Sequence, residues 1–183
     1  MNLDQLRQSM RSQGVTRLYV KFLSPNDNSK NQPYLGGDFS SLTILPHGDL
    51  STETGGRGTR FKALIDYYWL LEDGGLEAAR GAQLILYPQY PEVRFSGFLR
   101  GCRNAPNDVM TSRDEGRVLF LGITEDQRIV GHAVFSDHEL AGSIEEYRAI
   151  NQVGVFNQLP ISGSVGQHDA DREALLTELK RIY

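Results

Sequence analysis

The chain has 183 residues, 39% of them hydrophobic and 23% charged, which suits one globular domain and not a disordered tail. Its single cysteine excludes an intrachain disulfide and a zinc site built from several cysteines. No apolar run approaches the roughly 18 residues of a membrane span, and the N-terminus has no signal-type stretch. We therefore expect no membrane partner and a cytoplasmic location.

The net charge of −4 is unevenly distributed along the chain. Residues 1–103 carry 12 basic and 10 acidic side chains, a net charge of +2, whereas residues 104–183 carry 7 and 13, a net charge of −6. Fifteen of the 19 basic residues are arginine, whose planar guanidinium suits phosphate and guanine. Such a chain can present a basic face to nucleic acid, although arginine richness also follows genome composition.

The first part of the chain predicts a helix and then strands. Asn2 is placed to cap a helix that ends near Gly14. Residues 16–23 are β-rich and alternate between two faces, which predicts a strand. A second β-like run is expected at residues 42–45, and the Gly-, Ser- and Thr-rich stretch 47–59 is interpreted as a loop.

The middle of the chain predicts antiparallel pairs of strands. Residues 61–71 are apolar and aromatic, and their periodicity leaves helix and strand open, although three consecutive aromatic residues favour a strand. Residues 83–87 and 92–99 flank a Pro-bounded tip and predict a hairpin. A further antiparallel pair is expected from residues 118–124 and 129–135.

Two more helices are predicted after the strands. Ser136 and Glu139 form a capping box for a helix that runs to about residue 151, and residues 169–183 have apolar side chains at helical spacing. The order of elements predicts an α+β, mainly β fold with about seven short strands around a small barrel and peripheral helices. Residues 1–183 are expected to form this one domain.

The sequence contains only weak candidates for catalysis. Glu178 and Lys180 fit the Glu-x-Lys tripeptide of metal-dependent nucleases, but they lie in the last predicted helix, where such a pair usually belongs to a solvated face. We assign no catalytic residue, no metal ligand and no cofactor to this domain. A small metal-dependent nuclease or hydrolase using Asp27, Glu92 and His132 remains an alternative, as does a protein-interaction module that regulates a nuclease.

The polar loop that follows residue 23 is the first candidate binding site. Its amide side chains offer both a donor and an acceptor, which reading a base edge requires, and its lysines are placed to reach phosphates. By residue type alone, an ordinary Asn/Asp/Ser turn also fits. The candidate residues are Lys21, Ser24, Asn26, Asp27, Asn28, Ser29, Lys30, Asn31 and Gln32.

The tip between residues 87 and 94 is the second candidate. Arginine suits guanine, and glutamate suits the amino group of cytosine. Alone, this segment also fits a plain hairpin, but two polar loops on one small barrel can form a pincer around a duplex. The candidate residues are Gln89, Tyr90, Glu92 and Arg94.

Residues 18–27, Leu-Tyr-Val-Lys-Phe-Leu-Ser-Pro-Asn-Asp, resemble the opening strand and loop of the N-terminal effector domains of EcoRII-like, Type IIE restriction endonucleases. Residues 92–101 and 118–146 are similar to these domains in order and hydrophobic pattern, so the resemblance covers about two thirds of the chain. The resemblance implies a DNA-binding pseudobarrel, a fold shared with plant B-three transcription-factor domains.

The resemblance also implies a function for the two loops. In that family two arms grip the major groove and read a short CCWGG-type site, while a separate C-terminal domain cleaves with Mg²⁺. Here the first arm corresponds to residues 21–32 and the second arm to about residues 87–94. The chain is then expected to be the non-cleaving N-terminal effector domain of a longer bacterial enzyme. Its partners would be double-stranded DNA and the C-terminal catalytic domain of the same chain.

Overall fold

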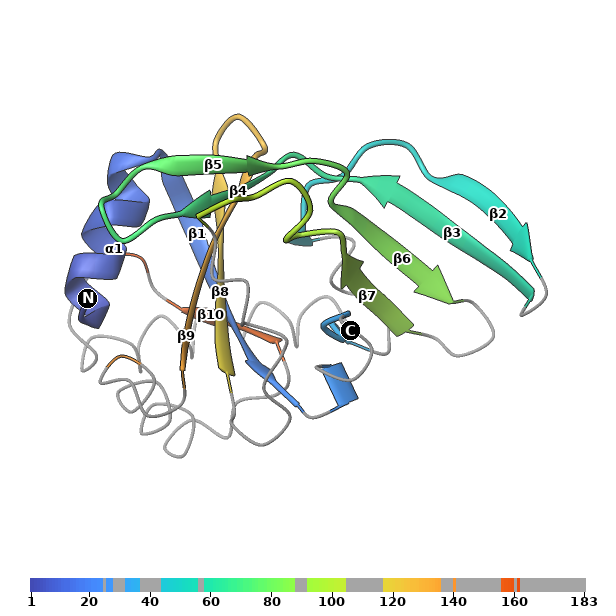
Figure 1. Ribbon diagram of the computed structural model, residues 1–183, viewed down its shortest axis with the longest axis horizontal. Coiled ribbons are helices and arrows are strands. Elements are labelled where there is room, and N and C mark those ends of the chain that lie inside the picture. Colours follow the sequence, from blue (N-terminus) through green and yellow to red (C-terminus); the bar gives the residue numbers. More distant parts are fainter. Residues whose placement is uncertain are drawn as a thin grey trace, which may run out of the picture.

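The computed structural model describes residues 1–24, 26–27, 32–36, 44–55, 58–87, 92–104, 117–135, 140, 156–159 and 161. These residues form one helix and ten strands in two sheets (Figure 1). The predicted α+β, mainly β fold is confirmed, with more strands than the seven expected. The predicted helix at residues 136–151 lies outside the described residues except for Leu140, and the one at 169–183 lies wholly outside them.

The larger sheet has six strands in the order β10-β1-β8-β9-β4-β5. All neighbours pair antiparallel except β4 and β9, which run parallel. The strands predicted at residues 16–23, 118–124 and 129–135 are confirmed, whereas β5 and β10 were not expected. The six strands are β1 (Val15–Leu23), β4 (Tyr67–Leu70), β5 (Leu76–Ala79), β8 (Arg117–Thr124), β9 (Ile129–Phe135) and β10 (Phe156–Leu159).

The smaller sheet has four antiparallel strands in the order β2-β3-β6-β7. The predicted hairpin is confirmed as β6 and β7, and β7 ends before Gly97, whose φ of 72° turns the chain. The undecided run at 61–71 forms the end of β3 and the whole of β4. The four strands are β2 (Ser51–Gly55), β3 (Gly58–Leu64), β6 (Gln83–Tyr87) and β7 (Glu92–Ser96).

Two local predictions were wrong. The expected loop at residues 47–59 contains β2 and the start of β3, because the register from Ser51↔Lys62 to Gly55↔Gly58 gives these polar residues backbone partners. The expected strand at 42–45 is not formed at its described residues, Ile44 and Leu45. Leu45 is instead buried in the core, so the apolar run reports burial and not extended structure.

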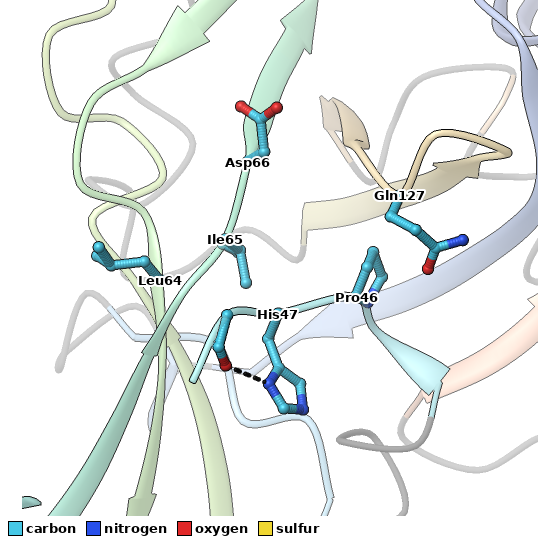
Figure 2. A pocket seen from close by; sticks show the side chains of 7 residues that line it. Pro46, His47, Leu64, Ile65, Asp66 and Gln127 are labelled. Carbon is cyan, nitrogen blue, oxygen red and sulfur yellow. Dashed lines mark hydrogen bonds between the residues drawn. The ribbon is translucent and has the colours of Figure 1, made fainter. Parts of the chain in front are cut away.

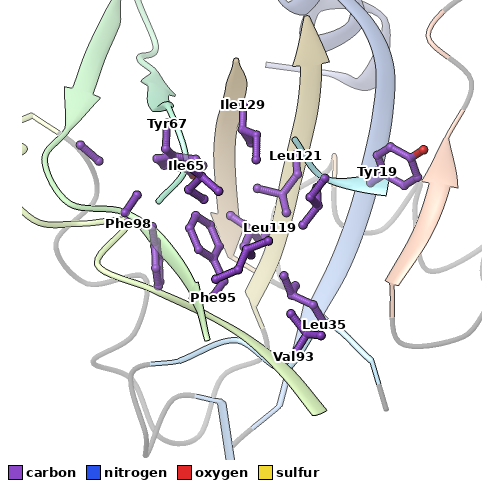
Figure 3. Close-up of a cluster of buried hydrophobic side chains, with 14 of the residues drawn as sticks. Tyr19, Leu35, Ile65, Tyr67, Val93, Phe95, Phe98, Leu119, Leu121 and Ile129 are labelled. Carbon is purple, nitrogen blue, oxygen red and sulfur yellow. The ribbon is translucent and has the colours of Figure 1, made fainter. Parts of the chain in front are cut away.

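The main hydrophobic core lies between the two sheets (Figure 3). It combines side chains of the larger sheet, such as Tyr67 and Leu121, with Val93 and Phe95 of the smaller sheet. The two sheets are joined at a corner where the Ile65 amide donates to the Ala82 carbonyl at 3.1 Å. Shared burial and this corner explain the barrel-like closure of the fold.

A second hydrophobic cluster covers the opposite face of the larger sheet. Helix α1 (Leu3–Ser12) packs Leu6 and Met10 there against Leu18 and Phe120. The predicted cap is confirmed, since the Asn2 side-chain Oδ1 accepts a hydrogen bond from the backbone amide of Gln5 at 2.9 Å. Because the larger sheet is buried on both faces, β1 contributes apolar side chains to both hydrophobic clusters.

Candidate nucleic-acid interface

Lys21 lies inside the protein at the root of the first arm. Its side chain belongs to the face of β1 that points between the sheets, and it is only 2% exposed. Its Nζ donates to Asp27 Oδ2 at 3.0 Å and to the Phe22 carbonyl at 2.7 Å. This placement corrects the expectation that Lys21 reaches a phosphate, because its ammonium group is used within the fold.

Asp27 holds the base of the first arm closed. Its Oδ2 accepts from the amide and the hydroxyl of Ser24, each at 2.8 Å, and its Oδ1 accepts from the Tyr34 amide at 2.7 Å. Burial by itself raises the pKa of Asp27, but the hydrogen bonds from the backbone and the charge of Lys21 outweigh it and hold the pKa below its ordinary value. Asp27 and Ser24 therefore act as an anchor here, in contrast to the predicted role as base contacts.

Arg94 of the second arm is also buried, at 4% exposure. Its Nε and Nη2 donate to the two carboxylate oxygens of Glu92 at 3.0 and 3.1 Å, and its Nη1 donates to the Gln32 carbonyl at 3.1 Å. The guanidinium also lies 5.6 Å from the centre of the Tyr34 ring. These contacts engage all three guanidinium nitrogens, so the geometry favours a structural role for Arg94 over the predicted reading of guanine.

The structure brings the described roots of the two arms together, since Arg94 contacts Gln32 although about 60 residues separate them in the sequence. Segment 33–36, which follows the first arm, runs alongside β7 as an added strand-like partner. The Phe95 amide donates to the Pro33 carbonyl at 2.9 Å, and the Leu35 amide donates to the Val93 carbonyl at 2.8 Å. Leu35 is 1% exposed and lies against Val93 in the core (Figure 3). The arms are thus fastened to the same strand and the same core.

The remaining predicted residues divide into two groups. Of these, Asn26 is exposed and Gln32 is half-buried. Tyr34, which sequence reasoning missed, joins the two arms through its amide and its ring; its position directly after the polar loop was the available signal. The residues that lie outside the described part of the chain are Asn28, Ser29, Lys30, Asn31, Gln89 and Tyr90.

A second group of charges that sequence reasoning missed lies on β2 and β3. Arg60 Nε donates to Glu53 Oε2 at 2.6 Å, and Lys62 Nζ lies 2.5 Å from the same oxygen. Hydrogen bonds from Arg60 and Lys62 lower the pKa of the exposed Glu53 to about 2. The side chain of Arg60 is 36% exposed and that of Lys62 is 25% exposed. One carboxylate thus holds two cations at the surface.

The described residues give no support to the catalytic alternative. Asp27 is bound by Lys21, Glu92 is bound by Arg94, and His132 is buried with its Nδ1 3.1 Å from the Leu70 carbonyl. Within the described ranges, no group of three or more His, Cys, Asp or Glu side chains is placed to hold a metal ion. Glu178 and Lys180 lie outside these ranges.

An open hollow of about 480 Å³ lies at the corner between β3 and β4 (Figure 2). It is lined by Leu64, Ile65 and Asp66 of this corner, by Pro46 and His47, and by Gly48 and Gln127. The Nδ1 of His47 lies 2.8 Å from the Gly48 carbonyl, so this ring nitrogen already has a partner. Leu64 ends β3, so the hollow lies at the opposite end of the smaller sheet from the second arm.

The comparisons with known proteins support the fold. No family model and no curated protein matches the chain. Among solved structures, the B3 domain of the UbaLAI restriction endonuclease with cognate DNA is similar, with a TM-score of 0.50 and 13% sequence identity. The match covers 85% of this chain and 96% of that one. The chain therefore shares the fold of a B3 domain.

The low sequence identity to the UbaLAI domain corrects one expectation from the sequence. The resemblance suggested that the chain is the UbaLAI N-terminal domain itself, and 13% identity shows that it is a different protein of similar fold. The predicted plant B-three-like pseudobarrel is confirmed at the level of fold. Within the described residues, no helix has the length and apolar character needed to cross a membrane.

Proposed function

We propose that this chain is a sequence-specific double-stranded DNA-binding domain. The observation that carries the proposal is the joining of the two arms, through Arg94 and through segment 33–36 on β7, at one end of a pseudobarrel. Base reading needs polar groups held on a rigid support, and both arms are anchored in the core here. The solved B3 domain of similar fold is described with cognate DNA, which supports the same class of ligand.

The finer proposal is that the chain is the regulatory effector domain of a Type IIE restriction endonuclease and reads a CCWGG-type site. Cleavage would then belong to a C-terminal catalytic domain that uses Mg²⁺, in a bacterial cytoplasmic enzyme. The resemblance of residues 18–27 to EcoRII-like effector domains supports this assignment. The domain itself would need no cofactor and would cut no DNA.

Base reading is assigned to the polar residues beyond the buried roots of the arms. Lys21, Asp27 and Arg94 are buried and paired within the protein. The candidates for contact with bases are therefore Asn26 and Gln32 together with residues 28–31 and 89–90. We expect Lys30→Ala to weaken binding to every duplex, because lysine contacts phosphates. Asn31→Ala should instead reduce the preference for the cognate site, because amides read base edges.

The test is fluorescence anisotropy at fixed salt with duplexes that contain CCWGG or a scrambled site. The proposal predicts that the scrambled duplex binds at least tenfold more weakly, since a mismatched base pair costs about 1–3 kcal/mol. Equal binding of both duplexes would refute sequence-specific recognition of this site. Cleavage of plasmid by the purified chain with Mg²⁺ would instead support the nuclease alternative.

A further inference from the structure

The β2–β3 hairpin extends from the body of the protein on the same side as the second arm. Figure 1 shows β2 and β3 reaching away from the larger sheet, beside β6 and β7. Gly55 at the end of β2 and Tyr87 at the end of β6 lie at the same end of the sheet, because β3 is antiparallel to both β2 and β6. All five residues of β2 are exposed. This hairpin therefore offers an accessible surface next to the arms.

The charges of the hairpin share one face of the sheet with the second arm. Pairing places Glu53 beside Arg60 on the neighbouring strand, and Tyr87 beside Glu92. Arg60 hydrogen-bonds with Glu53 and also with Tyr87, and both interactions raise its pKa, the one with Glu53 more. Arg60 thus connects the two pairs into one row across four strands. In the next row, Lys62 pairs with Ile85 and Ile85 with Arg94. Directly paired residues point to the same face.

We propose that the β2–β3 hairpin is a third contact surface that binds the phosphate backbone of DNA through Arg60 and Lys62. The inference rests on the proposed function and names where the duplex continues beyond the arms. Residues 51–64 carry three basic side chains and one acidic side chain, although the whole chain has a net charge of −4. A locally basic hairpin on an acidic protein is the charge pattern that a polyanion recognises.

The spacing of the strands fits this partner. Two strand separations of about 4.8 Å place β3 roughly 10 Å from β7. A duplex carries about one phosphate charge per 1.7 Å of its axis, so several phosphates lie within that distance of a site held by the arms. Glu53 holds the two cations at one point of the surface in the free protein. A DNA phosphate would compete with this carboxylate for the two cations.

The first experiment removes the two cations. The Arg60→Ala/Lys62→Ala protein should lose affinity equally for cognate and scrambled duplexes, and the slope of log K against log salt should fall by about two units. Arg128→Ala is the matched control, because Arg128 is 32% exposed and pairs with Asp126 in the turn between β8 and β9. The control should bind within about twofold of wild type. Circular dichroism confirms that each variant is folded.

The second experiment has the opposite sign. Glu53→Gln frees both cations, so binding should become roughly threefold tighter at low salt on either duplex. Asp126→Asn makes the same charge change away from the arms and should have no comparable effect. Unchanged binding in the double variant, or equal gains in Glu53→Gln and Asp126→Asn, would overturn the inference while wild-type binding to DNA still upholds the proposed function. If the wild-type protein binds no duplex, both fail together.

Discussion

At the scale of single residues, the described charges at the roots of the two arms are paired within the protein. Lys21 and Asp27 form an ion pair in which both side chains are at most 2% exposed. Removing two charges from water is costly, and the hydrogen bonds from Ser24 and Tyr34 to the Asp27 carboxylate offset part of that cost. The pair therefore fixes how the first arm leaves β1.

We expect Asp27→Asn to lower the free energy of unfolding by about 3–5 kcal/mol at neutral pH, because Lys21 is left buried without a counter-charge. Urea denaturation measures this loss. Asp126→Asn is the control. Asp126 is 61% exposed and pairs with Arg128 at the surface, where an ion pair contributes about 1 kcal/mol or less. Equal losses in both variants would show that the buried pair does not anchor the arm.

The same pair predicts an acid-sensitive stability. The pKa of Asp27 lies below its ordinary value of 3.8, so its stabilising effect is complete above that pH and is lost as the pH falls through the folded-state pKa. The stability difference between wild type and Asp27→Asn should therefore be constant from pH 7 to about 5 and narrow below pH 4. Urea denaturation at each pH tests this. A difference that stays constant down to pH 2 would contradict the prediction.

A charge swap separates a structural role of Arg94 from base reading. Arg94→Ala should reduce the preference for cognate DNA, because it unfastens Gln32 from β7. Exchanging Glu92 and Arg94 keeps an ion pair on the same face of the strand and should restore part of this preference. If Arg94 reads guanine, the swapped protein should discriminate no better than Arg94→Ala in the anisotropy assay.

At the scale of elements, the parallel pairing of β4 with β9 depends on a close contact between an aromatic ring and glycine. A methyl group at Gly131 would overlap the hydroxyl of Tyr67, so no larger residue fits there without movement. The Tyr67 hydroxyl is buried and has no hydrogen-bond partner among the described residues. The contact thus combines tight packing with an unsatisfied polar group.

Two substitutions at this contact should have opposite effects. Tyr67→Phe should raise the free energy of unfolding by about 1 kcal/mol or more, because it removes the unsatisfied hydroxyl and keeps the ring. Gly131→Ala should lower the free energy of unfolding by about 1–3 kcal/mol through overpacking. Urea denaturation of both variants checks the signs. A destabilised Tyr67→Phe protein would mean that the hydroxyl is hydrogen-bonded.

The elements also show which parts of the structure were predictable. Buried strands such as β6 and β8 were predicted because apolar runs follow burial. β2 was missed because all of its residues are exposed and no apolar pattern marks it. The burial of Lys21 was not foreseen, because it depends on the packing of the two sheets against each other. The ion pair between Glu92 and Arg94 could have been predicted from their spacing, since residues i and i+2 of a strand share a face.

At the scale of the whole molecule, one core serves both sheets. The only tryptophan of the sequence, Trp69 on β4, is fully buried and donates from its Nε1 to the Phe98 carbonyl at 2.6 Å. Phe98 follows β7 and packs against Phe95 with ring centres 4.8 Å apart, and Phe95 packs against Tyr67 at 5.0 Å (Figure 3). These aromatic rings connect the larger sheet to the strand that fastens both arms.

The aromatic connection predicts a single cooperative unfolding transition. Trp69 fluorescence and far-ultraviolet circular dichroism should report the same urea midpoint, because neither sheet keeps its core without the other. Phe98→Ala should lower the free energy of unfolding by about 3–5 kcal/mol, and both midpoints should shift together to lower urea concentration. Two separate transitions, or a shift of the fluorescence midpoint alone, would show that the sheets unfold independently.

Because the arms are fastened to this shared core, DNA binding should stabilise the entire domain and not the arms alone. Cognate duplex at 100 times its Kd should add about 2.7 kcal/mol to the free energy of unfolding, by mass action. This gain should appear equally in Trp69 fluorescence, which reports on the larger sheet, and in circular dichroism. Scrambled duplex at the same concentration is the control and should add less, in proportion to its weaker binding. A gain seen by neither probe while anisotropy shows tight binding would mean that the arms bind DNA without coupling to the core.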